Sequence, residues 1–267
     1  MTSAPVSLFS ELPASLTLQR DGAVGVVRLS RPEKRNALDD RTVAALQSFF
    51  GAPPEGIRAV VLAGEGDHFS AGLDLSGVAA RDTAAGVAHS MRWHRAFEAI
   101  EFGSVPVVSV LHGAVIGGGL ELAAATHVRV AERSAFFALP EGQRGIFIGG
   151  GGAVRLPRLI GTARVMDMIL TGRVYDAQHG EAIGIVQYLV ETGAGMSTAL
   201  DLAHRIAANA PLTNFAIVHA LPRIADAPPG IGYLTEALVA AIAQGDPEAK
   251  SRVADFLEKR APKVRST

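Results

Sequence analysis

The chain has 267 residues, a formal net charge of −1 from 25 basic and 26 acidic side chains, and no cysteine. Its length fits one sizeable domain with a smaller appendage, and a 48% share of apolar residues is sufficient for a buried core. The balanced charge argues against a nucleic-acid or membrane-surface protein, and the lack of cysteine excludes disulfides and thiolate metal sites.

The N-terminal segment, Met1 to Leu12, has neither a cationic start nor a long apolar run, so it does not look like a signal peptide. No stretch of the chain reaches the roughly 18 consecutive apolar residues that a membrane-spanning helix needs. We therefore expect a cytoplasmic protein with no membrane partner and no nucleic-acid partner.

The first predicted elements are a strand, a helix and a second strand. Ala23 to Leu29 is an apolar, β-branched run that indicates a strand. Asp39 or Asp40 can cap a helix, because apolar side chains recur at helical spacing after them. Arg58 to Ala63 is a continuous apolar strand that follows a turn with two prolines.

The next elements are a helix over Met91 to Ile100 and a third continuous apolar strand over Val105 to Leu111. Shorter strands are predicted over Val128 to Ala131 and Gly184 to Val190. Continuous apolar strands separated by helices indicate a sheet that is covered on both faces. The fold class is therefore α/β with parallel strand pairing.

The composition changes after about Thr192, beyond which the pattern is helical. Asp246, Pro247 and Glu248 together are a helix start signal, with the aspartate as the cap and the proline in the first turn. We therefore predict an α/β core with the active site in residues 1–195 and a helical module in residues 196–267.

Two segments that follow apolar strands can present free backbone N–H groups. His68 to Leu75 (HFSAGLDL) contains small residues that let a ligand approach the backbone, although a simple tight turn also accounts for it. Gly113 to Leu122 (GAVIGGGLEL) places three glycines at the start of a helix, where N–H groups are unpaired and the helix dipole is positive. This run lacks the G-x-G-x-x-G order of a dinucleotide-binding site.

Two glutamates stand in apolar surroundings near these segments. Glu121 lies in the first turn of the glycine-led helix, and Glu141 follows an apolar run and Pro140. A carboxyl group in such surroundings tends to have a raised pKa, which suits an acid or base near neutral pH. Taken singly, each glutamate has a structural explanation. Together with two amide-presenting segments, the pair can stabilise an enolate oxygen while a proton moves at a neighbouring carbon.

Other reactive side chains give weaker signals. Among the eight histidines, His89 and His94 are five residues apart, which is off helical register for joint metal binding. Ser70 lies in no G-x-S-x-G motif, which argues against a serine hydrolase. The sequence therefore predicts no metal site and no serine nucleophile.

In their order and spacing, these segments resemble the crotonase superfamily, specifically its enoyl-CoA hydratase branch. The similarity runs from Arg31–Leu38 to Phe256–Arg260 and includes HFSAGLDL, GGGLEL, PEG followed by GGGG, and LTGR at Leu170 to Arg173. It implies a ClpP/crotonase-type spiral of ββα units. It also implies a C-terminal helical module that takes part in oligomerisation and covers coenzyme A.

The resemblance implies a role for particular residues of this chain. The backbone N–H groups of Leu73 and Gly118 would form the oxyanion hole, Glu121 and Glu141 would handle the water and the α-carbon proton, and Gly149 would line the water site. The residues expected to bind coenzyme A are Ala71, Asp74, Leu75, Ser76 and Lys259, and Trp93 would either pack in the core or line the acyl pocket.

The same resemblance implies an acyl-CoA thioester as the substrate, no metal, and no cofactor other than the coenzyme A that is part of the substrate. Members of the family assemble as homotrimers or as dimers of trimers (homohexamers), and lysine at the position of Lys259 reaches a neighbouring subunit's coenzyme A phosphates. We therefore expect a homo-oligomer of this kind.

Because both glutamates are present, the resemblance favours an enoyl-CoA hydratase of fatty acid metabolism, a lyase that converts a 2-enoyl-CoA reversibly to a 3-hydroxyacyl-CoA. The alternatives are a Δ3-Δ2 enoyl-CoA isomerase, another crotonase reaction (dehydratase, hydratase/lyase or hydrolase), and a non-catalytic binding protein of the same fold. His112, Leu120 and Ile148 differ from residues common in hydratases, and these differences bear on the choice of substrate.

Overall fold

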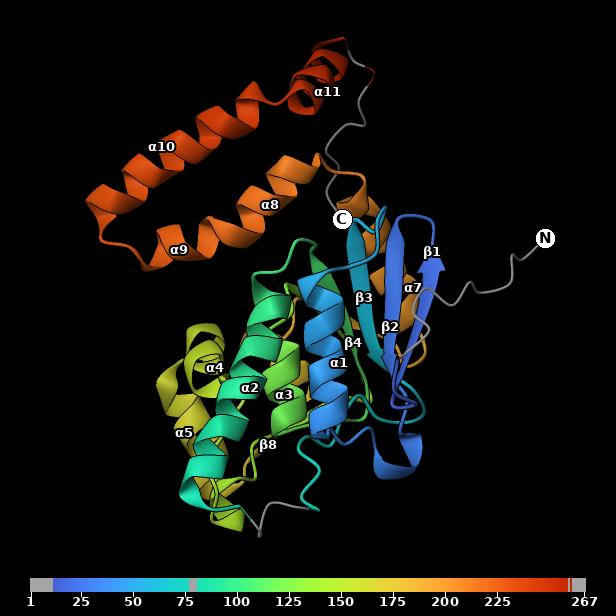
Figure 1. Ribbon diagram of the computed structural model, residues 1–267, viewed down its shortest axis with the longest axis vertical. Coiled ribbons are helices and arrows are strands. Elements are labelled where there is room, and N and C mark those ends of the chain that lie inside the picture. Colours follow the sequence, from blue (N-terminus) through green and yellow to red (C-terminus); the bar gives the residue numbers. More distant parts are fainter. Residues whose placement is uncertain (1–11, 77–80, 259, 261–267) are drawn as a thin grey trace, which may run out of the picture. The chain divides into compact units, whose positions relative to one another are not determined.

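The structure, a computed structural model, describes residues 12–76, 81–258 and 260. These residues form two compact units that divide between Ala207 and Ala208 (Figure 1). The division falls one helix later than the predicted boundary at residue 195. The reason is that helix α7 (Gly195–Ala207), although part of the helical C-terminal pattern, packs on the sheet of the first unit.

A six-stranded sheet in the order β1-β2-β3-β4-β6-β9 forms the centre of the first unit. Its strands are β1 (Leu16–Asp21), β2 (Val24–Leu29), β3 (Ala59–Gly64), β4 (Val107–Leu111), β6 (Val128–Glu132) and β9 (Tyr188–Val190). β1 is antiparallel to β2, and every other neighbouring pair is parallel. The predicted parallel α/β sheet is thus confirmed, with the last strand shorter than predicted and β1 added at the edge.

A second, three-stranded sheet consists of β5 (Ala114–Ile116), β7 (Phe136–Ala138) and β8 (Val174–Asp176). β5 and β7 are parallel, and β7 and β8 are antiparallel. Each of these strands has only three residues, which is too few to show a recognisable alternation of apolar and polar side chains. The sequence pattern therefore did not predict them.

The remaining elements of the first unit are helical. They are η1 (Pro32–Lys34), α1 (Asp40–Gly51), α2 (Thr83–Glu101), α3 (Gly118–Ala124), η3 (Gly142–Arg144), α4 (Gly152–Ile160), α5 (Thr162–Thr171) and α6 (Ala177–Ala182). The predicted cap of α1 is confirmed, because the Thr42 N–H donates to the Asp39 carboxylate at 2.8 Å. α2 begins eight residues before its predicted start at Met91, because Asp82 caps it by accepting the Ala85 N–H at 2.8 Å.

The six-stranded sheet is covered on both faces, as its continuous apolar strands predict. Successive side chains of a strand point to opposite faces, so Val26 and Val27 of β2 belong to different apolar clusters. Val26 packs in the cluster that contains α7, and Val27 packs in the cluster that contains α1 and α2. Figure 1 shows α1 and α2 on one side of the sheet and α7 on the other.

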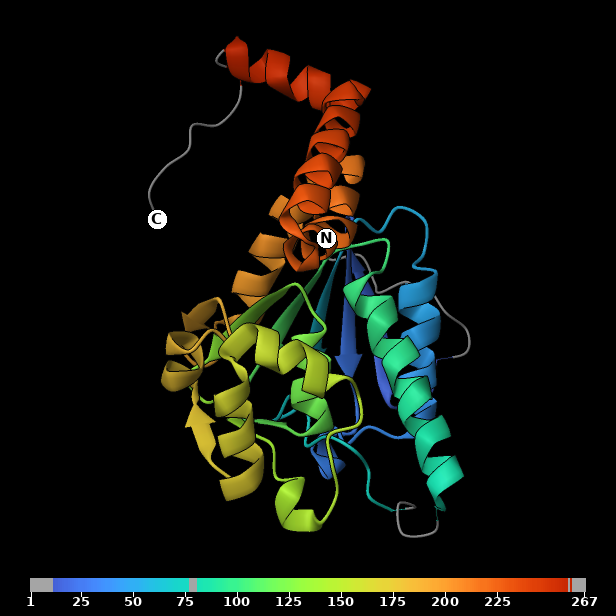
Figure 2. The ribbon, with the colours of Figure 1, turned by 90° about the vertical axis from the view of Figure 1, so that its left-hand side faces the viewer.

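The second unit contains only helices among its described residues. These are α8 (Pro211–His219), α9 (Leu221–Asp226), α10 (Pro229–Gly245) and α11 (Pro247–Leu257), and α10 runs back along α9 and α8 (Figures 1 and 2). The predicted start of α11 is confirmed, since Asp246 accepts the N–H groups of Glu248 and Ala249. In the described parts of both units, every helix is too short or too polar to cross a membrane.

Candidate active site

One cavity of the first unit, of about 250 Å³, brings together most of the residues that the sequence singled out. It is lined by Ala71, Leu73, Leu75, Trp93, Gly118, Glu121, Glu141 and Gly149, among others. Asp74 and Ser76 instead line a neighbouring hollow of about 260 Å³ that shares Leu73 and Arg81 with this cavity. Lys259 lies outside the described residues.

The pairing of β5 with β7 places the two glutamate-bearing segments next to each other. β5 leads into Gly117 and α3, and β7 leads towards Glu141. The Gly117 N–H donates to the Ala138 carbonyl at 2.9 Å, which ties the two strand ends together. Gly117 has a φ of 53°, and a Cβ at this position would overlap Glu141 Oε1. Glycine at position 117 therefore permits both the turn and the position of the carboxyl group.

Glu121 is only 3% exposed and is held by backbone amides of the late glycine run. Its Oε1 accepts the N–H groups of Gly150 and Gly152, each at 2.8 Å. Burial raises the pKa of Glu121 above its ordinary value, although these hydrogen bonds and the charge of Arg155 act in the opposite direction. The amides of Gly150 and Gly152 therefore fix the position of the Glu121 carboxyl group in the cavity wall.

Glu141 is 7% exposed, and its Oε2 has no hydrogen-bond partner among the described residues. Burial raises the pKa of Glu141 to about 7, and the charge of Glu121 adds to this rise. A carboxyl group with this pKa exists in both protonation states near neutral pH. It can therefore accept or donate a proton there.

The backbone N–H groups of Leu73 and Gly118 converge on the same cavity. The chain around Leu73 is fixed because the Leu38 N–H donates to the Gly72 carbonyl and the Asp74 N–H donates to the Leu38 carbonyl. Neither the Leu73 N–H nor the Gly118 N–H, the first of α3, has an acceptor within the described ranges. The two groups are close, since a Cβ on Gly118 would lie 3.3 Å from the Leu73 nitrogen. Such a pair can bind a carbonyl oxygen that gains negative charge.

Ser70 supports this turn from behind. Its hydroxyl donates to the Asn36 carbonyl at 2.8 Å and accepts the Gly72 N–H at 3.1 Å. The side chain is fully buried, and its hydroxyl is engaged in holding the turn rather than free in the cavity. This arrangement agrees with the expectation that Ser70 is no nucleophile.

Helix α2 forms one wall of the cavity, which the sequence indicated only at Trp93. Trp93 is 3% exposed, packs in the apolar core and also lines the cavity. Gly86, His89 and Ser90 also line the cavity from α2. They precede Trp93 by seven, four and three residues, respectively, which is the spacing of one helix face. This spacing could have identified them from the sequence.

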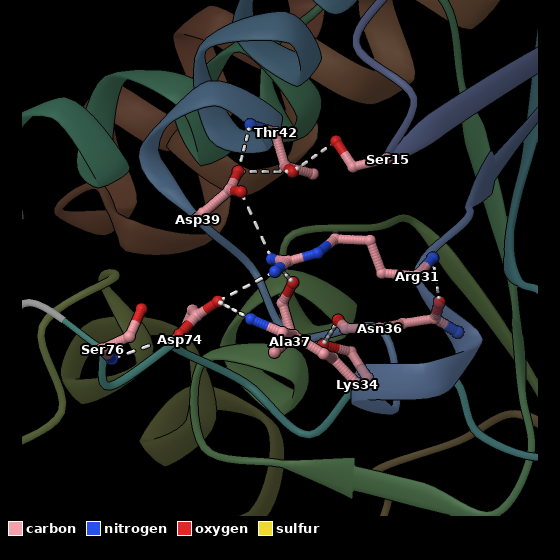
Figure 3. A network of polar contacts seen from close by, with 10 residues as sticks. Ser15, Arg31, Lys34, Asn36, Ala37, Asp39, Thr42, Asp74 and Ser76 are labelled. Atoms are coloured by element: carbon pink, nitrogen blue, oxygen red, sulfur yellow. Dashed lines mark hydrogen bonds and ion pairs between the residues drawn. The ribbon is translucent and has the colours of Figure 1, made fainter.

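Asp74 belongs to a network of ion pairs beside the cavity (Figure 3). Arg31 Nη2 lies 3.0 Å and Lys34 Nζ 3.7 Å from the Asp74 carboxylate, and Arg31 also pairs with Asp39. A hydrogen bond with Ser76, together with these cations, lowers the pKa of Asp74 to about 2. Asp74 is therefore ionised near neutral pH and anchors the segment that follows Leu73.

Solved structures share this fold over almost the whole chain. A protein of Rhodopseudomonas palustris CGA009, provisionally named an enoyl-CoA hydratase, is 56% identical, with a TM-score of 0.90 over 92% of this chain and 95% of that one. An enoyl-CoA hydratase of Mycobacterium smegmatis is 30% identical, with a TM-score of 0.88 over 93% and 98% of the two chains. The fold is therefore that of the crotonase-type α/β proteins.

Curated relatives agree with the structural similarity. The short-chain-enoyl-CoA hydratase of Clostridium acetobutylicum is 33% identical over 74% of this chain and 77% of that protein. The enoyl-CoA hydratase EchA19 of Mycobacterium tuberculosis is 29% identical over 92% and 94%. The fatty acid oxidation complex subunit alpha of Shewanella loihica is 38% identical over 71% of this chain but only 28% of that longer protein.

The model of the family described as enoyl-CoA hydratase/isomerase matches residues 19–266. The chain belongs to this family and is an enzyme of the crotonase type.

Proposed function

We propose that this protein is an enoyl-CoA hydratase that adds water reversibly to a 2-enoyl-CoA and forms a 3-hydroxyacyl-CoA. The observation that carries the proposal is the presence, in one cavity, of two buried glutamates with raised pKa values and two backbone N–H groups that lack acceptors among the described residues. Several relatives named enoyl-CoA hydratase support the same reaction. The relative from the fatty acid oxidation complex supports a substrate from fatty acid metabolism.

The Leu73 and Gly118 N–H groups are the proposed oxyanion hole. When water adds to the β-carbon of an enoyl thioester, negative charge moves to the thioester oxygen, which becomes enolate-like. Two N–H donors directed at this oxygen stabilise the transition state more than the ground state. One such donor typically contributes about 3–4 kcal/mol to lowering the barrier.

Glu121 and Glu141 are the proposed acid and base. Hydration needs one group that takes a proton from water and another that gives a proton to the α-carbon. Two neighbouring carboxyl groups whose pKa values are raised by burial meet both needs, because one can accept a proton while the other donates one. Gly149 is the proposed water site, because it lines the cavity and carries no side chain there. With amides and carboxyl groups for these tasks, the proposed reaction requires neither a metal nor a further cofactor.

Ala71 and Leu75 are proposed to contact the coenzyme A part of the substrate next to the oxyanion hole. Leu75 is 44% exposed although it is apolar, as expected for a side chain that a ligand covers. Asp74 and Ser76 line the adjoining hollow, where they are proposed to help position the far end of coenzyme A. The cysteine-free composition fits a cytoplasmic location.

We also propose that the second unit contributes to a homotrimer or a dimer of trimers. α10 buries only Gly232 among its residues. Its large exposed apolar side chains are Ile231, Tyr233, Leu234, Leu238 and Ile242. Several large exposed apolar side chains on one helix are typical of a subunit interface. A second copy of the chain is the partner that the family resemblance implies.

The test follows the absorbance of the conjugated thioester of crotonyl-CoA after purified protein is added. Wild type should remove it rapidly. Glu121→Gln and Glu141→Gln should each lower kcat by roughly 10²–10⁴-fold, and the double variant should be inactive. Glu98→Gln, at an exposed position of α2, is the control and should keep wild-type activity.

A decrease in kcat of less than tenfold in either glutamate variant would mean that this glutamate is not part of the mechanism. If wild type does not convert crotonyl-CoA, the same assay with longer and aromatic 2-enoyl-CoA substrates tests whether the protein hydrates any enoyl thioester. Failure to hydrate any of them would reject the hydratase assignment and favour another reaction of the family.

A further inference from the structure

Gly86 lies inside α2, three residues after its start, and lines the cavity. Glycine is unfavourable within a helix relative to alanine, because it loses more backbone freedom on folding. Gly86 is absent from the glycines with positive φ, so its backbone conformation does not require glycine. A Cβ at this position would meet no atom of the described residues within 4 Å, apart from the backbone of its own helix. Neither backbone geometry nor packing within the described residues explains this glycine.

The other glycines of the cavity wall have a packing reason. A Cβ on Gly117 or Gly118 would overlap Glu141 or Trp93, respectively. A Cβ on Gly149 would lie 2.9 Å from Ser90 Oγ, and one on Gly150 would lie 3.0 Å from the Phe97 ring. Of these five cavity-lining glycines, only Gly86 has no neighbour at its Cβ position in the part of the chain that the structure describes, which points to a ligand as the reason for glycine here.

The position of Gly86 along α2 gives its distance from the reacting end of the cavity. Trp93 lies at the reacting end of the cavity, because its ring abuts the positions of Gly118 and Gly150. Gly86 is seven residues earlier on the same helix face, with Ser90 between them. Seven residues of α-helix rise about 10 Å. The cavity wall therefore extends well beyond the carboxyl groups towards Gly86.

We propose that Gly86 is a specificity-determining residue, which leaves room for the acyl chain of 2-enoyl thioesters substantially longer than crotonyl. This inference rests on the proposed hydratase function. Crotonyl carries a single methyl group beyond its double bond and does not extend 10 Å along α2. A medium-length, unbranched apolar chain does, and it passes the apolar surface of Trp93 on the way. A side chain at position 86 fills the space that the end of this chain occupies.

The experiment compares kcat/KM for crotonyl-CoA and trans-2-decenoyl-CoA in wild type, Gly86→Leu and Ala88→Leu. Ala88 is exposed on the same helix and is not part of the cavity wall, so its variant controls for added bulk. Gly86→Leu should lower kcat/KM for the decenoyl substrate at least about tenfold more than it lowers kcat/KM for crotonyl-CoA. Ala88→Leu should change neither value. Circular dichroism and the unfolding midpoint confirm that both variants fold.

Equal losses for both substrates in Gly86→Leu would place the coenzyme A part of the substrate at this position and overturn the inference. An unchanged decenoyl rate in Gly86→Leu, or a wild type that hydrates crotonyl-CoA but not decenoyl-CoA, would also overturn it. If wild type hydrates no enoyl thioester, the proposed function fails first, and this inference fails with it.

Discussion

The carboxyl group of Glu141 is buried, and one of its oxygens has no hydrogen-bond partner in the described part of the chain. Its pKa rises from 4.5 to about 7 on folding, so the folded state binds the proton more tightly than the unfolded state. Stability from this group is therefore complete below pH 4.5 and is lost as the pH rises through about 7.

We predict that Glu141→Gln, which cannot ionise, increases the free energy of unfolding at pH 8 by up to about 3 kcal/mol. The difference from wild type should shrink to nothing towards pH 4.5, where Glu141 is protonated in both states. Urea unfolding of both proteins at a series of pH values measures it. If the free energy of unfolding depended on pH identically in the two proteins, the pKa of Glu141 would be the same in the folded and unfolded states.

Gly152 determines where the Glu121 carboxyl group lies. A Cβ on Gly152 would come within 2.6 Å of Glu121 Cγ and 2.8 Å of Oε1. We predict that Gly152→Ala displaces this carboxyl group and lowers kcat by up to about 10²-fold with little change in KM, because displacements near 1 Å have effects of this size. Steady-state kinetics measures both constants. Ala153→Val, at the next and exposed position, is the control, and equal kcat values in the two variants would argue against this role of Gly152.

At the scale of single elements, the start of α1 is stabilised by Asp39. Its carboxylate accepts the Thr42 N–H at 2.8 Å and the Thr42 hydroxyl at 2.7 Å, and it pairs with Arg31 (Figure 3). We predict that Asp39→Ala lowers the free energy of unfolding by about 1–2 kcal/mol. Asp39→Asn should lose less, because asparagine caps helices as well as aspartate does. Urea unfolding at pH 7 measures both, and a loss in Asn equal to that in Ala would assign the stabilisation to the Arg31 ion pair instead.

The elements differ in how clearly their sequences predicted them. β2, β3 and β4 are buried on both faces, so each is a continuous apolar run that is readily seen. β1 lies at the sheet edge and buries only Leu16 and Leu18, which leaves a weak pattern. The three-residue strands of the second sheet depend on one another for hydrogen bonds and carry almost no local signal.

At the scale of the whole molecule, the exposed apolar side chains of α10 bear on the assembly. We predict that sedimentation equilibrium gives three or six times the chain mass of 27.8 kDa. Introducing lysine at Leu234 and Leu238 should shift the protein to smaller species, because an interface core does not tolerate unpaired charges. Gln244→Lys, at an exposed polar position of the same helix, should not. A monomeric wild type would contradict the prediction.

The sequence by itself determined the parallel α/β core, the helical nature of the C-terminal part and the segments that line the cavity. Apolar runs, aspartate caps and glycine-rich turns are local features, and each is visible in a few consecutive residues. Glu121 and Glu141 were identified for the same reason, as carboxyl groups in apolar stretches.

Only the tertiary structure decided which groups meet in the cavity. Glu121 accepts N–H groups from residues about thirty positions away, and the Leu73 and Gly118 N–H groups converge from separate turns. Pairing of the short strands β5 and β7 brings Glu141 to Gly117, and α2 adds Gly86 and Ser90 to the wall. These contacts join residues distant along the chain. They depend on how the elements pack and not on any local pattern, which is why the sequence alone could not predict them.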